Sequence, residues 1–256
     1  MILRGLCLGA GVLVVVALAD LVYEIVHGAA PAFSRYGLGF VGHTEWAPNF
    51  KHFGAAAMLY GTAVTSAMAL LIAAPLSIAI GLYLAMLAPR TVRVIVGPLV
   101  EMLAAIPSVI LGFWGIIVFA PFIAKRVEPP LHSVLGWTGL FGTPQATGVS
   151  MFTASVILAV MIIPIIASLS RDLFLSVPSE LTDGAEALGA TRWEVIRGVV
   201  IPTTFGGVVS AVMLGLGRAL GEALAVALTI GGGGVIHSDL FQTGNTLAAR
   251  IALEIQ

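Results

Sequence analysis

Long apolar runs, separated by shorter polar stretches, make up most of this chain. A helix needs about 20 apolar residues to cross the hydrocarbon core of a bilayer, and several runs reach or approach that length. We expect five membrane spans at about residues 5–26, 55–87, 94–123, 150–167 and 201–230, with polar loops at 27–53 and 124–149. The pattern predicts an all-α polytopic membrane protein in which residues 1–256 form a single transmembrane domain.

The composition agrees with this pattern and narrows the classes of function. Hydrophobic residues make up 59% of the chain and charged residues 10%, against about 25% charged residues in soluble domains, and the mean hydropathy is +1.05. A net charge of −1 gives no bias toward nucleic acid. Because Cys7 is the only cysteine, the sequence excludes an internal disulfide and a cysteine-ligated metal cluster, and we expect no metal site.

The first apolar run has a competing interpretation. It contains Ala17-Leu18-Ala19, a small-residue sequence of the kind that precedes a signal-peptide cleavage site. We favour a retained span, because apolar residues resume after Asp20 and further spans follow. Basic residues divide almost evenly between the two sides of the membrane, so their distribution does not orient the chain.

Residues 176–202, which we call the elbow, are too strongly patterned for a plain linker. Pro178 suits the first turn of a helix, and Gly189 can adopt the left-handed conformation that ends one. Thr191 and Glu194 then follow the capping-box pattern, in which the hydroxyl caps a new helix and the glutamate reaches back. The sequence predicts a helix, a glycine turn and a second helix, with a connector lying on the membrane surface as the alternative.

Arg218 and Glu222 lie within the apolar run of the expected last span. An arginine at the bilayer centre costs roughly 2.5–3.5 kcal/mol on insertion scales, so it rarely faces lipid. Four residues apart on a helix, the two side chains share one face and can pair. One interpretation is a self-neutralising pair that locks helix packing, which Gly217 and Gly221 favour by allowing close helix approach.

The other interpretation of Arg218 and Glu222 is a path for an oxyanion. A guanidinium carries a permanent charge and a fork of N–H donors that fits a tetrahedral oxyanion. Glu222 would hold Arg218 when the path is empty. Phosphate near neutral pH retains a proton and sulfate does not, so a carboxylate that accepts that proton in a hydrogen bond would favour phosphate and repel sulfate.

The expected third span holds Glu101, Pro107 and Ser108. Glu101 is either a second residue of the path or a buried acceptor between helices. Pro107-Ser108 is expected to break the helix near the middle of the membrane, where broken helices expose the amide dipoles that bind anions in transporters; a simple proline kink is the alternative. Glycines 231–234 are expected to form a flexible loop, because no Lys-Ser/Thr follows them to make a P-loop.

The elbow resembles the EAA loop of ABC importer permeases. That pattern is Glu-Ala-Ala, three residues, Gly, nine residues and Ile-x-Leu-Pro. The matching positions here are Asp183-Gly184-Ala185, Gly189 and Val199-x-Ile201-Pro202. Asp replaces Glu and Gly replaces the first Ala, and Gly184 weakens the helix by about 1 kcal/mol relative to Ala. In the family this loop docks into a groove of a cytoplasmic ATPase.

Further segments extend the resemblance to the permeases of phosphate ABC importers, and among them to the C-type subunit. These segments are EMLAAIPSVILGFWG (101–115), ALGATRWEVIRGVVIP (187–202), GRALGEALAV (217–226) and FGAAAMLYGTAVTS (53–66). The resemblance implies a type I ABC importer permease fold, which normally has six spans. Residues 246–256 resemble the lead-in to the sixth, so we expect the C-terminus of this sequence to be incomplete.

The resemblance implies a non-enzymatic permease subunit of an ATP-driven phosphate importer in the bacterial cytoplasmic (inner) membrane, with the N-terminus and the elbow cytoplasmic. The chain has no nucleotide motif, so it is expected to hold no cofactor, and ATP and Mg²⁺ would bind to a separate ATPase. The implied partners are an A-type permease subunit, a cytoplasmic ATPase dimer, an extracytoplasmic phosphate-binding protein and membrane lipid.

On this interpretation the site residues fall into two groups. The substrate path would be lined by Arg218, Glu222, Glu101, Pro107 and Ser108, and coupling to the ATPase would use Asp183, Gly184, Ala185, Gly189 and Pro202. The alternatives are a permease for another oxyanion, such as sulfate or molybdate, and a gradient-driven secondary transporter. The elbow argues against the secondary transporter, which has no need of an ATPase dock.

Overall fold

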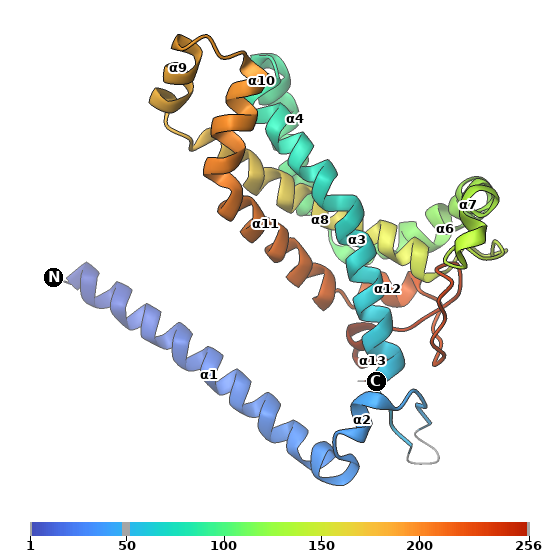
Figure 1. Ribbon diagram of the computed structural model, residues 1–256. Coiled ribbons are helices and arrows are strands. Elements are labelled where there is room, and N and C mark those ends of the chain that lie inside the picture. The colour runs from blue at the N-terminus through green and yellow to red at the C-terminus, as the bar shows by residue number, and fades with distance from the viewer. Residues whose placement is uncertain (1, 48–51, 255–256) are drawn as a thin grey trace. The chain divides into compact units, whose positions relative to one another are not determined.

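The computed structural model describes residues 2–47 and 52–254, and across them it is helical, without a strand (Figure 1). Five helices in these residues are long and apolar enough to cross a bilayer: Leu3–Tyr36, Ala56–Leu87, Ser108–Thr138, Met151–Leu175 and Arg192–Gly221. The predicted all-α fold with five spans is therefore confirmed. Contacts divide the chain into two compact units, residues 1–56 and 57–256.

The first unit contains α1 (Ile2–Tyr36) and the short α2 (Gly39–Gly42). Apolar side chains of α1 are exposed all around the helix, as suits contact with lipid or with a partner helix. The prediction that the loop begins at residue 27 is wrong. Alanines flank Pro31 and favour the helix, and a proline removes only one backbone hydrogen bond, so α1 continues through it.

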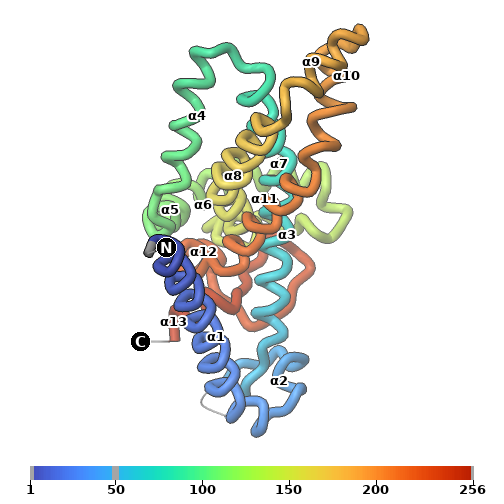
Figure 2. Tube along the Cα trace, turned by 90° about the vertical axis from the view of Figure 1, so that its left-hand side faces the viewer, coloured from blue at the N-terminus to red at the C-terminus, as the bar shows by residue number. Residues whose placement is uncertain are grey.

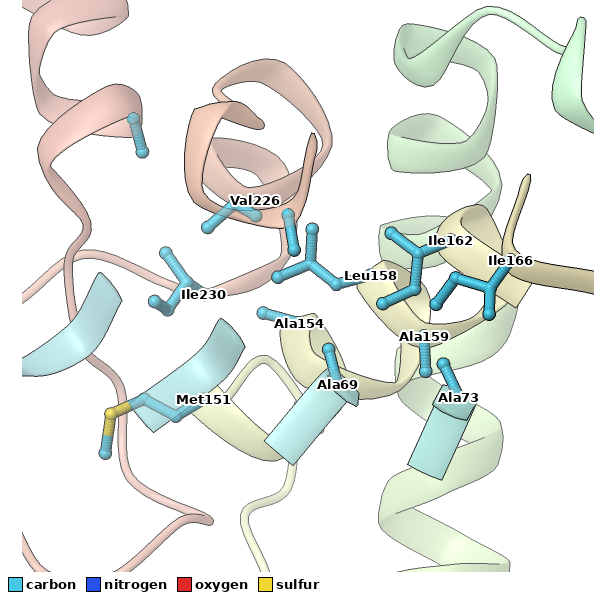
Figure 3. Close-up of a cluster of buried hydrophobic side chains, with 12 residues drawn as sticks. Ala69, Ala73, Met151, Ala154, Leu158, Ala159, Ile162, Ile166, Val226 and Ile230 are labelled. Atoms are coloured by element: carbon cyan, nitrogen blue, oxygen red, sulfur yellow. The ribbon is translucent and has the colours of Figure 1, made fainter. Parts of the chain in front are cut away.

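The second unit is built around α8 (Met151–Leu175), the most buried of the five spanning helices. Ser150 caps α8 by accepting a hydrogen bond from the Thr153 N–H at 3.2 Å. The helix packs against α3 (Ala56–Leu82) and against α12 (Leu224–Thr229) in a buried cluster (Figure 3). That cluster includes Ala69, Ala73, Leu158, Ile162, Ile166, Val226 and Ile230.

The second span runs as predicted, because α3 continues through a π-helical turn (Tyr83–Leu87). The predicted third span, 94–123, is wrong, because the structure divides it. Helix α4 (Arg90–Ala104) ends before Pro107, and a new helix begins at Ser108. Pro107 has no N–H to continue α4 and disfavours the α conformation in the residue before it. Figure 2 shows α4 leading into α5 along one side of the unit.

The helix that begins at Ser108 continues to Thr138. It comprises α5 (Ser108–Trp114), α6 (Ala120–Phe122), α7 (Glu128–Leu135) and a 3₁₀ turn (Gly136–Thr138), joined by π-helical turns (Gly115–Phe119 and Ile123–Val127). The loop predicted from residue 124 is therefore wrong up to residue 138. The π-helical turns precede the prolines of α6 and α7, where a widened turn accommodates the missing N–H groups.

The last two predicted spans, 150–167 and 201–230, also have different limits. Helix α8 continues to Leu175. The helices α10 (Arg192–Val195) and α11 (Ile201–Gly221) join through a π-helical turn (Ile196–Val200), and α12 (Leu224–Thr229) is separate. Hydropathy marks the part of a helix that suits a membrane, whereas its ends depend on backbone hydrogen bonding, so polar residues extend both helices at the elbow end.

The segment predicted to lead into a sixth span is helical within the described residues. Helix α13 (Leu247–Glu254) follows the loop after α12. The Leu247 N–H donates to Thr62 Oγ1 at 3.0 Å, and Ala249 is fully buried in the cluster around α8. This segment is therefore anchored to α3 and to the core of the second unit.

Close packing of α3 on α8 predicts a site-specific response to one added methyl group. A Cβ at Gly81 would lie 2.9 Å from the Ala167 carbonyl oxygen, whereas a Cβ at Gly206 meets nothing within 4 Å. Alanine favours a helix over glycine by about 1 kcal/mol at either position. We expect Gly206→Ala to leave the stability of the detergent-solubilised protein unchanged or to raise it. Gly81→Ala should lower the free energy of unfolding by about 1–3 kcal/mol and with it the melting temperature. Equal melting temperatures for the two variants would contradict this packing.

Candidate functional site

The elbow has the predicted helix–glycine–helix structure. Helix α9 (Ser179–Ala187) ends before Gly189, which has a φ of +91°. Thr191 Oγ1 then accepts a hydrogen bond from the Glu194 N–H at 3.4 Å, and Glu194 Oε2 accepts one from the Thr191 N–H at 2.7 Å. This reciprocal capping box starts α10. Short-range side-chain and backbone preferences therefore determine the turn.

The elbow packs against the ends of two membrane helices. Phe174 near the end of α8 and Ala85 near the end of the second span are buried with Val195 and Val200, and Ala185 of α9 packs against the same cluster. Asp183 and Gly184 lie on the exposed side of α9. Pro202, the last residue of the predicted coupling set, lies in the first turn of helix α11, away from the glycine turn at Gly189. The elbow thus presents an exposed acidic residue on a fixed base.

The predicted ion pair between Arg218 and Glu222 is not formed in the described structure. Helix α11 ends at Gly221, and Glu222 has an extended backbone, with φ −73° and ψ 117°. The two side chains therefore do not follow the helical spacing on which the prediction depended. Glu222 Oε1 instead accepts a hydrogen bond from the Ala225 N–H at 3.2 Å, at the start of α12.

Arg218 and Glu222 nevertheless line the same hollow, which has a volume of about 600 Å³. Its other lining residues are Ile165, Met213, Leu214, Gly217 and Gly221. A Cβ at Gly217 or Gly221 would meet no atom of the described chain within 4 Å, so the predicted close helix approach at these glycines is not found within this chain. The hollow has apolar and glycine walls with one cationic and one anionic side chain.

Two helix breaks lie at the same end of a packed helix pair. The predicted break at Pro107-Ser108 is present, with Pro107 at the N-cap of α5 and Ser108 as the first residue of that helix. A Cβ at Gly112 would lie 2.9 Å from Ala225 Cα, and one at Gly115 would lie 2.9 Å from Thr229 Cγ2. Helices α5 and α12 therefore run parallel in close contact, and both begin at a break.

Glu101 does not line the hollow with Arg218. Its Oε1 accepts a hydrogen bond from Arg171 Nη2 at 2.8 Å, which joins α4 to α8. Of the two interpretations of Glu101, an acceptor between helices fits this geometry, although the side chain is half-exposed rather than buried. The sequence did not single out Arg171, because it lies beyond the apolar run 150–167, and only the structure extends this helix to Leu175.

Comparison with known proteins places these features in a family context. Residues 77–251 match the family model described as the binding-protein-dependent transport system inner membrane component. That range contains both helix breaks, the elbow, Arg218 and Glu222.

Curated relatives match almost the whole chain. The phosphate transport system permease protein PstC of Mesorhizobium japonicum is 44% identical over 249 residues, which cover 96% of this chain and 76% of the relative. The protein of the same name from Pasteurella multocida is 42% identical over 95% of this chain and 77% of its own length. PstC 1 of Mycobacterium tuberculosis is 38% identical over 95% of this chain and 78% of its own length.

Proposed function

This chain belongs to the family of binding-protein-dependent transport system inner membrane components, and we propose that it is the permease subunit of an ATP-driven importer that moves inorganic phosphate across the bacterial cytoplasmic membrane. The observation that carries the proposal is the similarity, over 96% of the chain, to a protein named as a phosphate transport permease. The helical fold with five spans and the elbow agree with a permease.

The hollow next to the break after α11 supplies groups that suit phosphate. Arg218 has an exposed guanidinium that forms no ion pair in the described structure, so an oxyanion does not have to displace a carboxylate to reach it. Its N–H fork fits two oxygens of a tetrahedral anion. Glu222 is half-buried on the same hollow and can accept a hydrogen bond from the P–OH group that phosphate retains near neutral pH. Sulfate offers Glu222 no hydrogen and is repelled.

The elbow is the proposed contact with a cytoplasmic ATPase, with the N-terminus on the same side of the membrane. Asp183 and Gly184 are exposed for docking, while Ala185 holds α9 to the bundle. ATP and Mg²⁺ would bind to that ATPase, and no cofactor is assigned to this chain. A second, A-type permease would close the other side of the path, an extracytoplasmic binding protein would deliver phosphate, and lipid would cover the apolar faces.

The charged pair of the hollow gives the direct test of this function. Arg218→Lys keeps the charge and loses the fork, so phosphate uptake by reconstituted importer should fall on the order of tenfold. Glu222→Gln should keep phosphate uptake closer to the parent but admit sulfate, because the repelling charge is gone. Uptake of labelled phosphate and sulfate measures both effects. A parent that prefers sulfate or molybdate would contradict the assignment to phosphate.

An apolar double variant separates a transport role from a packing role. Arg218→Met with Glu222→Leu fills similar space without charge, so assembly of the importer should persist while phosphate uptake is lost. Size-exclusion chromatography reports assembly, and labelled phosphate reports uptake. Parental uptake by this double variant would show that the two residues serve packing alone.

The positive φ of Gly189 predicts that the elbow tolerates only glycine at the turn. A β-branched side chain there costs on the order of 1–2 kcal/mol in the left-handed region. We expect the importer assembled with Gly189→Val to hydrolyse ATP without moving phosphate, or the variant to lose binding to the ATPase. Gly184→Ala in α9 should keep both ATP hydrolysis and phosphate uptake. Coupled uptake by Gly189→Val at the parental rate would remove the elbow from the mechanism.

The break before α5 predicts different effects for two prolines. Pro107→Ala restores an N–H at the break and should let α4 run into α5, which lowers phosphate uptake more than assembly. Pro98 lies inside α4, which continues through it without a break, so Pro98→Ala serves as the matched control. If the two variants transport phosphate equally, the break at Pro107 has no specific role in the path.

A further inference from the structure

Arg171 joins α8 to α4 near the elbow, outside the proposed substrate path. Its Nη2 donates to Glu101 Oε1 of α4 and to Asp172 Oδ1, both at 2.8 Å, and its Nε donates to the same Asp172 oxygen at 3.0 Å. The Arg171 side chain is only 16% exposed, whereas those of Glu101 and Asp172 are 52% and 62% exposed. One guanidinium therefore has a partner on its own helix and another on a neighbouring helix.

The surface of α4 is shaped to receive the Arg171 guanidinium. A Cβ at Gly97 would lie 3.0 Å from Arg171 Nη1, which is closer than most real contacts. Glu101 follows Gly97 by one helical turn and lies on the same face. Gly97 thus provides the space and Glu101 the acceptor.

Apart from its packing along α8, few contacts hold α4 in position. Of its fifteen residues, all of which the structure describes, Gly97 alone is buried. Arg93 Nη2 donates to the Ala85 carbonyl oxygen at 2.6 Å, which ties the first turn of α4 to the end of the second span. The other end of α4, which leads to the break at Pro107, is held by the Glu101–Arg171 bond. A helix with this much exposed surface has room to shift along α8 when that bond opens.

Arg171 itself is firmly connected to the base of the elbow. A Cβ at Gly81 of α3 would lie 3.0 Å from the Arg171 backbone nitrogen, so α3 packs tightly on this turn of α8. Phe174, one turn further along α8, is buried with Val195 and Val200 of the elbow. Packing therefore connects the base of the elbow to the turn of α8 that carries Arg171.

We propose that the Glu101–Arg171 bond is an exchangeable latch, through which movement of the elbow reaches α4 and the helix break at Pro107. Asp172 is the permanent partner of Arg171, so opening the latch leaves no uncompensated arginine. Glu101 is already half-exposed while bound to Arg171, so opening the latch leaves no buried carboxylate without a partner. Glu101 is thus a positioning residue that does not touch the transported anion. The latch depends on the proposed function only for its transport readout.

Two substitutions at the latch have different expected signatures in the reconstituted importer. Glu101→Gln weakens the α4 contact, so uptake should fall on the order of tenfold while ATP hydrolysis continues, with the KM for phosphate and the selectivity over sulfate unchanged. Asp172→Asn leaves Glu101 as the sole counter-charge, so the latch should open less readily, and uptake and ATP hydrolysis should fall together. Melting temperatures of both variants identify any loss of folding.

A third variant disturbs the latch without changing any charge. Gly97→Ala should push the guanidinium from its seat and reproduce the Glu101→Gln signature, and Gly206→Ala, which meets no neighbour, is the control. A changed KM or selectivity in Glu101→Gln would place Glu101 in the path and overturn the latch. An unchanged ratio of uptake to ATP hydrolysis in both Glu101→Gln and Gly97→Ala would overturn it as well, whether or not their melting temperatures fall. If only the Arg218 tests fail, the proposed substrate path is wrong, and the ratio of uptake to ATP hydrolysis still tests the latch.

Discussion

Close packing around α8 is the constraint on which the second unit depends. Lipid is as apolar as the side chains, so membrane helices associate through tight van der Waals contact, which small residues allow. Gly81 brings α3 against the α8 backbone, and Gly215 brings α11 against Ile162 and Ile166. This packing holds the base of the elbow at one end of α8 and supports α12 along the same helix. Movement at the elbow therefore has a stiff element to act on.

The two helix breaks, at Pro107 and at Glu222, are the places where this packed framework frees backbone polar groups. Inside a membrane, freed backbone groups need partners, and irregular backbone occurs where protein or a water-filled cavity surrounds it. At the second break the Glu222 side chain accepts the Ala225 N–H, so one carboxylate both supports the new helix and faces the hollow. Parallel packing of α5 on α12 brings the two breaks to one end of the pair.

The two arginines of these spans have different surroundings, which suit the two roles proposed for them. Arg171 is largely buried and has two carboxylate partners, which suits a connection between helices. Arg218 is exposed on a hollow and has no such partner in the described chain, which suits a group that binds a passing anion. The burial and partners of each arginine distinguish these roles, whereas the residue type does not.

The sequence by itself determined the features that depend on neighbouring residues: the apolar runs, the turn at Gly189, the capping box of Thr191 and Glu194, and the break at Pro107. These follow from backbone preferences that act over a few residues. Only the tertiary structure decided that Glu101 binds Arg171, 70 positions away, and that Glu222 leaves the face of Arg218. The partners of a long charged side chain depend on which helices lie side by side and on where each helix ends, and hydropathy contains neither.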